Sequence, residues 1–347
     1  MNYMAFVFPA IRGVQAGRDY YVSMVPLEVI PRIFQFSDEN LSPEDRSQRV
    51  LKRSRIPEIR DYILNNPDSY VFSSLTVSVD GDIQFVAAGE RDSYLGYIEI
   101  PMNARFLIND GQHRQAAIEE AVKRNPSLKD EHISVVFFRD EGLLRSQQMF
   151  SDLNRFAIRP TKSINILFNS REESSVIAKK VAEQVPVFKG HTEKEKTTLS
   201  NRSKALFTLS AICTATEELL RGIDKDAEAK TDLAVRFWTQ VASHIPEWSE
   251  ACSGRVKASE LRRDSICTFS ITLIALGYGG NALIKESPEG WEQRLSALDG
   301  IDWGKRNPTW DNLVFINGKV AANRSTQRAM SSYMRSVMTG NAGGNDV

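Results

Sequence analysis

Alternating hydrophobic and polar positions dominate the first 140 residues of the chain and predict a region rich in strands. Short runs of Val, Ile, Phe, Tyr and Thr recur there, and such runs are typical of strands. The predicted strands lie around residues 6–8, 20–25, 70–79, 83–87, 94–100, 105–108 and 133–138. The turn sequence Asp80-Gly81-Asp82 predicts a hairpin between the third and the fourth of them.

Helical patterns interrupt these strands at three places. Residues 42–65 begin with a Ser-Pro start signal, and Pro57 divides them into two predicted helices. Residues 112–123 form another predicted helix, which Asn125-Pro126 ends. A further helix is expected at residues 141–157.

The second half of the chain has a different pattern. From residue 164 to residue 280 almost every segment has helical period, and no convincing strand interrupts it. The last residues, 341–347, have the small and polar composition of a disordered tail. The sequence therefore predicts an α+β chain, with a mixed α/β domain at 1–165 followed by a mainly helical domain at 166–340.

Composition narrows the function only a little. The 347 residues include 44 Lys and Arg and 44 Asp and Glu, so the net charge is zero and gives no global support to nucleic-acid binding. A local basic patch on a neutral protein still binds phosphate well. The cysteines, Cys213, Cys252 and Cys267, match no zinc spacing and favour a reducing cytoplasm. The apolar start of the chain is too short for a signal peptide or a membrane span, so no membrane partner is expected.

The clearest candidate for chemistry is the run Asp110-Gly111-Gln112-His113-Arg114, which follows an apolar strand and opens a helix. Gly111 permits a sharp turn, and Asp110 is placed to cap the helix. The free N–H groups of the first turn and the helix dipole together favour an anion. Arg114 can hold phosphate oxygens, and His113 can donate a hydrogen bond or move a proton. The alternative is a capped helix whose His and Arg are ordinary surface residues.

These five residues are also the name-giving motif of the DGQHR-domain family, which the chain resembles over about residues 20–220. Residues 59–63 (Ile-Arg-Asp-Tyr-Ile) and 149–155 (Met-Phe-Ser-Asp-Leu-Asn-Arg) resemble the family's arrangement as well. The family includes DndB, the regulators associated with DNA phosphorothioation gene clusters. The resemblance implies a cytoplasmic repressor that binds double-stranded promoter DNA. Other proteins of the phosphorothioation system are further candidate partners, and a homodimer is one option.

DGQHR domains are in turn similar to the ParB/sulfiredoxin superfamily. There a Gly-x-x-Arg turn contacts nucleotide phosphates, and a helix bearing Asn and Arg completes the site. This chain lacks the Glu-Asn pair of ParB proteins and the Gly-Cys pair of sulfiredoxins. The only cofactor that the similarity leaves open is a nucleotide with Mg²⁺. The residues that the resemblance assigns to phosphate or nucleotide binding are Asp110, Gly111, Gln112, His113, Arg114, Asp152, Asn154 and Arg155.

Three basic clusters are candidates for contacts to a DNA backbone. In the densest cluster, around residues 46–55, a helix would place three arginines on one face. A solvated face balanced by nearby acids is an equal alternative there, and it is the favoured alternative for the clusters around residues 194–204 and 255–263. The candidate DNA contacts are Arg46, Arg49, Lys52, Arg53, Arg55, Arg202, Lys204, Arg262 and Arg263.

Two functions of different class follow from these residues. The first is a DNA-binding regulator. The second is an enzyme that hydrolyses nucleotides or cleaves DNA, with His113 or Asp110 as the acid or base and Arg114 stabilising charge. A scaffold for other proteins is a third hypothesis. No dedicated metal site is expected, because no histidine has a metal-ligand spacing.

Overall fold

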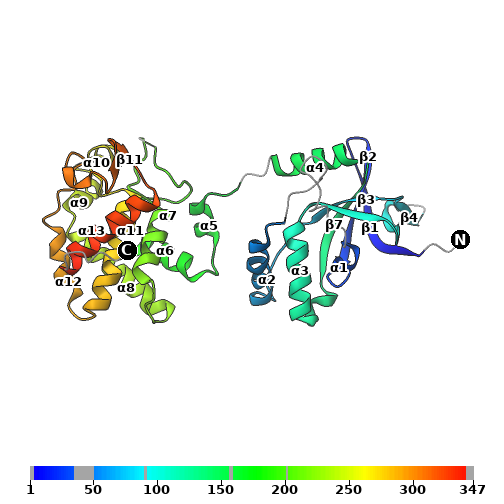
Figure 1. The fold of residues 1–347 in the computed structure, drawn as a ribbon, viewed down its shortest axis with the longest axis horizontal. Coiled ribbons are helices and arrows are strands. Elements are labelled where there is room, and N and C mark those ends of the chain that lie inside the picture. The colour runs from blue at the N-terminus through cyan, green and yellow to red at the C-terminus, as the bar shows by residue number, and fades with distance from the viewer. Residues whose placement is uncertain (1–3, 35–50, 90–91, 156–158, 201, 341–347) are drawn as a thin grey trace. The chain divides into compact units, whose positions relative to one another are not determined.

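The computed structural model describes residues 4–34, 51–89, 92–155, 159–200 and 202–340 (Figure 1). The predicted tail at 341–347 lies outside these residues. The chain forms two compact units, Met1–Ile158 and Arg159–Val347. No helix in the described part of the chain combines the length and the apolar character that a membrane crossing requires.

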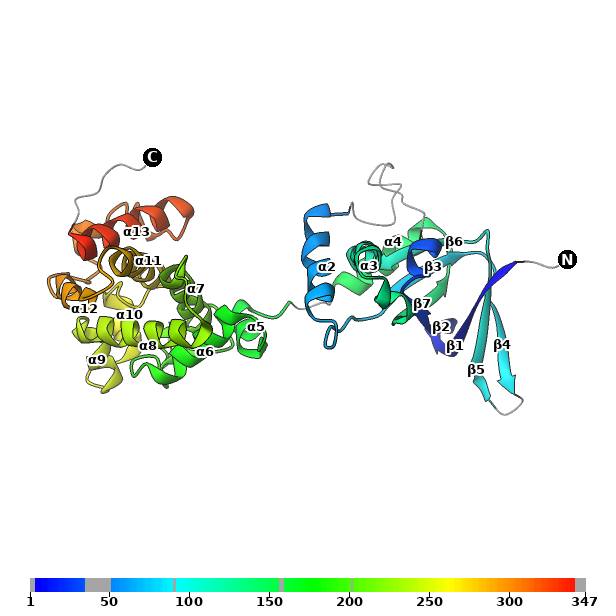
Figure 2. The ribbon, with the colours of Figure 1, turned by 90° about the horizontal axis from the view of Figure 1, so that it is seen from below.

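The first unit is built on a seven-stranded mixed sheet with the strand order β4-β5-β1-β2-β7-β3-β6 (Figure 2). Every neighbouring pair is antiparallel except β3 and β7, which are parallel. The strands overlap those that the sequence predicts. Their bounds are β1 (Ala5–Gln15), β2 (Arg18–Pro26), β3 (Leu75–Asp80), β4 (Gln84–Gly89), β5 (Asp92–Pro101), β6 (Arg105–Asp110) and β7 (His132–Arg139).

The hairpin predicted at residues 80–82 is wrong. β3 pairs with β7 and β6, whereas β4 pairs with β5 at the opposite side of the sheet. Burial explains the difference, because residues 75–79 of β3 are all buried and suit an inner strand covered on both faces. β4 is mostly exposed and suits an edge. The turn residues redirect the chain without pairing the strands that they connect.

Helices cover the two faces of this sheet unequally (Figures 1 and 2). One face carries α1 (Ile30–Ile33), α2 (Ile56–Asn65) and α3 (Gln112–Arg124), and the other carries α4 (Leu143–Arg155). The alternation along β3 separates the faces. Val77 joins the core with Ile118 of α3, whereas the Ser78 hydroxyl points the other way, 4.0 Å from the sulfur of Met149 on α4.

The second unit is mainly helical and has its own hydrophobic core. The long helix α11 is buried along most of its length and packs against α7 and α13. The helices are α5 (Lys162–Phe168), α6 (Glu173–Gln184), α7 (Leu209–Leu220), α8 (Ala227–Ser243), α9 (Pro246–Cys252), α10 (Ala258–Asp264), α11 (Ser270–Glu286), α12 (Trp291–Arg294) and α13 (Arg324–Thr339).

The expectation of no strand between residues 164 and 280 is wrong in one place. β8 (Thr192–Glu193) pairs in parallel with β9 (Phe207–Thr208). A two-residue strand shows no periodicity, so the hydrophobic pattern could not reveal it. Further along, β10 (Phe315–Ile316) pairs antiparallel with β11 (Lys319–Val320).

Candidate phosphate-binding site at the start of α3

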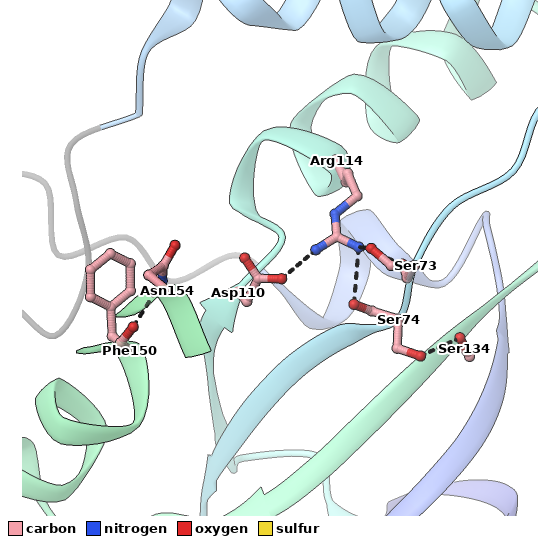
Figure 3. A network of polar contacts seen from close by, with 7 residues as sticks. All are labelled: Ser73, Ser74, Asp110, Arg114, Ser134, Phe150 and Asn154. Atoms are coloured by element: carbon pink, nitrogen blue, oxygen red, sulfur yellow. Dashed lines mark hydrogen bonds and ion pairs between the residues drawn. The ribbon is translucent and has the colours of Figure 1, made fainter. Parts of the chain in front are cut away.

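The turn between β6 and α3 has the geometry that the sequence predicts. β6 ends at Asp110, Gly111 turns the chain, and α3 begins at Gln112 (Figure 3). Gly111 has φ +107°, in the region that favours glycine. A Cβ atom at Gly111 would lie 2.4 Å from Cδ2 of Leu75, a buried β3 side chain. Any other residue would therefore meet both backbone strain and a clash.

Asp110 does not cap α3, so that expectation is wrong. The N-cap is Gly111, because the left-handed turn places the start of the helix one residue further along. The Asp110 carboxylate instead accepts a hydrogen bond from Nη2 of Arg114 at 2.5 Å, in an i,i+4 ion pair. The carboxylate therefore orients an arginine of the first helical turn.

The guanidinium of Arg114 fastens the turn to the segment that leads into β3 (Figure 3). Its Nη1 donates to the carbonyl oxygen of Ser73 at 2.5 Å, to that of Ser74 at 3.0 Å, and to the Ser73 hydroxyl. With Asp110 on Nη2, the side chain is only 15% exposed. A phosphate would have to displace these acceptors before Arg114 could hold it bidentately. Arg114 thus positions the turn in this structure.

Ser73 and Ser74 are the residues of this site that the sequence did not reveal. They lie about 40 positions before Arg114, as two polar residues ahead of a strand. Ser74 is also hydrogen-bonded through its hydroxyl to the hydroxyl of Ser134 on β7, at 2.7 Å. No spacing rule joins such distant positions, so only the pairing of β3 with β6 and β7 brings them to the turn.

His113 connects the turn to the basic segment. Its Nε2 accepts a hydrogen bond from the backbone N–H of Lys52 at 3.0 Å. The neutral ring therefore carries its proton on Nδ1. Partial burial lowers the pKa of His113, and the positive charges of Arg55 and Lys52 lower it further. The imidazole therefore favours its neutral form and lies in a positive electrostatic potential.

Exposed cations stand beside this histidine. Lys52, Arg53 and Arg55 are exposed, and none of them forms an ion pair with another residue in the described ranges. Arg53 and Arg55 belong to the 3₁₀ turn η1 (Arg53–Arg55), so the expected α-helical face is wrong for Arg53. The other two arginines of that predicted face, Arg46 and Arg49, lie outside the described residues.

The second predicted element, α4, packs beside β6 through a buried polar contact. Nδ2 of Asn109 donates to the Ser78 hydroxyl at 2.6 Å and lies 2.9 Å from the sulfur of Met149. Its Oδ1 is buried and has no hydrogen-bond partner in the described part of the chain. The residue before Asp110 is therefore fixed by contacts with both β3 and α4.

Two of the predicted site residues of α4, Asp152 and Asn154, form hydrogen bonds within the helix. Nε2 of Gln148 donates to Asp152 at 2.7 Å, and Nδ2 of Asn154 donates to the carbonyl of Phe150 at 2.8 Å. Figure 3 shows Asn154 near the end of β6. Asp152 instead lines a groove of about 420 Å³ between α4 and the β1–β2 hairpin. Arg155 is the last residue of α4 and is exposed.

The basic residues of the second unit are arranged differently. Nη1 and Nη2 of Arg262 donate to the backbone carbonyls of Ala205, Ser200 (3.0 Å) and Ser203 (2.8 Å). Burial lowers the pKa of this guanidinium. Arg262 therefore holds the 200–205 loop in place, and its donors point at the protein.

The neighbours of Arg262 divide into paired and free cations. Arg263 pairs with Asp264 through two hydrogen bonds of 2.9 and 2.7 Å. Arg202 and Lys204 are exposed, with no ion pair to any residue that the structure describes.

No group of three or more His, Cys, Asp or Glu side chains within the described ranges is arranged to hold a metal ion.

The fold and the turn define a two-unit α+β protein with a candidate phosphate site on its sheet unit. A comparison with protein families matches residues 8–340 to DndB, described as DNA-sulfur modification-associated. Searches of curated proteins and of solved structures found no match. Because the family match spans nearly the whole chain, this protein belongs to the DndB family, which confirms the resemblance to DndB.

Proposed function

We propose that this chain is a DNA-binding repressor of a DNA phosphorothioate modification gene cluster, and that the start of α3 binds a phosphate of the DNA backbone. The observation that carries the proposal is the hydrogen bond from Lys52 to His113. This hydrogen bond keeps the exposed cations Lys52, Arg53 and Arg55 beside the start of α3, where Gly111 has a positive φ angle. Membership of a family associated with DNA sulfur modification supplies the context.

Each group at the turn has a separate role in this proposal. The N–H groups at the first turn of α3 receive the phosphate oxygens, since the first four N–H groups of a helix lack intrahelical acceptors. Lys52 and Arg55 supply charge, and the Nδ1–H of His113 is a further donor. Arg114 keeps the turn in shape through Asp110 and the backbone before β3.

The proposal extends to the second element and to the fold. Asn154 lies near the end of β6 in Figure 3, and we propose that it lies beside the bound DNA backbone, with Arg155 next to it at the end of α4. This corresponds to a ParB/sulfiredoxin-like arrangement, in which a turn and a following helix enclose a phosphate. Asp152 is the least well placed of the predicted α4 residues to contact the phosphate, because the groove that it lines lies toward the β1–β2 hairpin.

The direct test is binding of the purified chain to a fluorescent duplex from the region upstream of its own gene cluster, followed by anisotropy. An unrelated duplex of the same length is the control. We expect tighter binding to the upstream duplex and a steep loss of affinity with salt, because phosphate contacts release counterions. No binding by micromolar protein at about 100 mM salt, where specific complexes are ordinarily far tighter, would overturn the proposal.

A nucleotide at the same turn is the second candidate. The start of α3 favours it, because the free N–H groups of the first turn, with His113 and Lys52 beside them, can donate to the phosphates of a nucleotide as well as to those of DNA. In that case His113 or Asp110 is the candidate acid or base of a hydrolytic enzyme. Calorimetric titration with each nucleoside triphosphate, with and without Mg²⁺, separates the two functions. Nucleotide binding that Lys52→Ala abolishes, without binding to DNA, would favour the enzyme.

A further inference from the structure

The sheet face that carries α4 is left largely uncovered. α4 packs over the β3–β6 side, where Met149 meets Ser78 and Asn109. Over most of β2, β1, β5 and β4, at the other side of the sheet in Figure 2, no described helix packs on this face, and α4 reaches only the turn end of β1 and β2, at Gln15 and Arg18. Six large apolar side chains there are between 49% and 57% exposed. These are Val7, Ile11, Met24, Val86, Leu95 and Tyr97, here called the apolar face.

The strand register places these side chains on one side of the sheet. Ile11 of β1 lies opposite Leu95 of β5 and opposite Val22 of β2. Tyr97, two residues along β5, lies opposite Val86 of β4. The remaining two are an even number of residues from these positions on β1 and β2, so they share the face. The intervening positions of β1 point into the core.

The exposed area of the apolar face is close to what a protein–protein interface requires of each partner. At roughly 100 Å² of exposed surface for each half-exposed large side chain, the six leave on the order of 600 Å² in water, the upper end for a monomer. Val22, Val136 and Phe138 extend it across β2 and β7 as partly buried neighbours. Its extent then approaches the about 800 Å² that each partner contributes to a standard interface.

Charge and shape point to one occupant. Glu99, opposite Val7, and Gln84 lie at one end of the apolar face. Gln15 and Arg18 lie at its other end, where Arg18 forms an ion pair with Glu141 at 3.0 Å. A cation that already has an acidic partner adds little attraction for DNA. A two-fold axis requires a patch that complements itself, and a flat apolar sheet face meets this requirement without any charge pairing. Two such faces stack about 10 Å apart with interdigitating side chains.

We propose that the apolar face joins two copies of this chain into a dimer, sheet against sheet, with Glu99 and Gln84 at its polar rim. This inference does not depend on the phosphate site. The apolar face lies on β4, β5, β1 and β2, at the opposite side of the sheet from β6, and includes none of the candidate DNA-binding residues.

Light scattering after size exclusion tests this on the full chain. We expect the mass of a dimer at micromolar concentration, and at least tenfold weaker association for Ile11→Lys and for Val86→Lys. Val71→Lys is the matched control, because Val71 is a 77% exposed apolar residue outside the apolar face. Circular dichroism of each variant establishes whether it folds.

A second measurement remains informative if the charged variants fail to fold. A cysteine introduced as Ile11→Cys should cross-link to its copy with a short bifunctional maleimide, whereas Val71→Cys and the parent chain should not. A monomeric parent chain would overturn the proposal, and so would a dimer that Ile11→Lys and Val86→Lys leave intact. Either result would mean that this face is covered by something other than a second copy of this chain.

Discussion

The basic residues beside α3 and those around α10 look alike as sequence but differ in what they contact. Lys52 and Arg55 are exposed cations next to a helix start, with no ion pair in the described residues. Arg262 and Arg263 direct their guanidinium groups at backbone carbonyls and at Asp264. Charge that already has a partner adds little to the binding of a phosphate, so Arg262 and Arg263 are weaker candidates for phosphate contacts than Lys52 and Arg55.

Arg114 and Arg262 show that this distinction is not one between the two units. Each directs its guanidinium group at backbone carbonyls of a nearby segment, those of Ser73 and Ser74 in one case and of Ser200 and Ser203 in the other. A planar fork of donors suits this role better than an ammonium group does. An arginine inside a conspicuous motif can therefore be structural while its less conspicuous neighbours face the ligand.

The largest expected effect concerns the glycine that shapes the first region. Gly111→Ala should destabilise the protein by about 3 kcal/mol, because backbone strain and the clash with Leu75 add together. Gly142→Ala is the matched control, since Gly142 also has positive φ, +100°, but no atom within 4 Å of an added Cβ. It should cost about 1 kcal/mol. Urea unfolding measures both, and equal losses would show that the close packing at Gly111 contributes nothing.

The next effect separates structural from surface arginines in the second unit. Arg262→Ala should destabilise the protein by about 2 kcal/mol, because carbonyls of the 200–205 loop lose a charged donor. Arg263→Ala should change the melting temperature very little, since its ion pair is exposed. Neither variant should alter DNA affinity when measured well below its melting temperature. A loss of affinity in Arg262→Ala without a loss of stability would reverse the assignment.

A smaller effect compares the free cations of the two regions directly. The double variant Lys52→Ala/Arg55→Ala should bind DNA about tenfold more weakly, with a salt slope reduced by about one to two. Arg202→Ala/Lys204→Ala removes two exposed cations from the second unit and should leave both quantities nearly unchanged. Fluorescence anisotropy over a salt series measures them. If the second double variant has the greater effect, the binding surface belongs to the helical unit.

How far the sequence could predict these regions depends on how far apart along the chain the contacting residues lie. The turn at Gly111 and the helix after it follow from residues 105–124 alone, because local conformation decides them. The pairing of β3 with β7 in place of β4, and the meeting of Arg114 with Ser73, depend on sheet order. Hydrophobic alternation gives a strand its faces but not its neighbours, so these features needed the structure.

The smallest expected effect is a pH dependence at His113. Its folded pKa lies below the ordinary value of 6.5, so the neutral form is the one that the fold favours. Stability from this residue is complete above about pH 6.5 and is lost as the pH falls through the lowered pKa. His113→Gln keeps an acceptor for the Lys52 N–H but cannot titrate. Its melting temperature should therefore fall less steeply than that of the parent chain between neutral and mildly acidic pH. Identical slopes would exclude this linkage.

The backbone amides at the start of α3 offer the most direct measurement. In a ¹⁵N-labelled sample titrated with the upstream duplex, we expect the largest amide shift changes at Gly111, Gln112, His113 and Arg114, with smaller changes at residues 52–55. Helix termini of the second unit should respond weakly. DNA binding that shifts residues 200–205 and 257–264 while the start of α3 stays unchanged would contradict the proposed phosphate site.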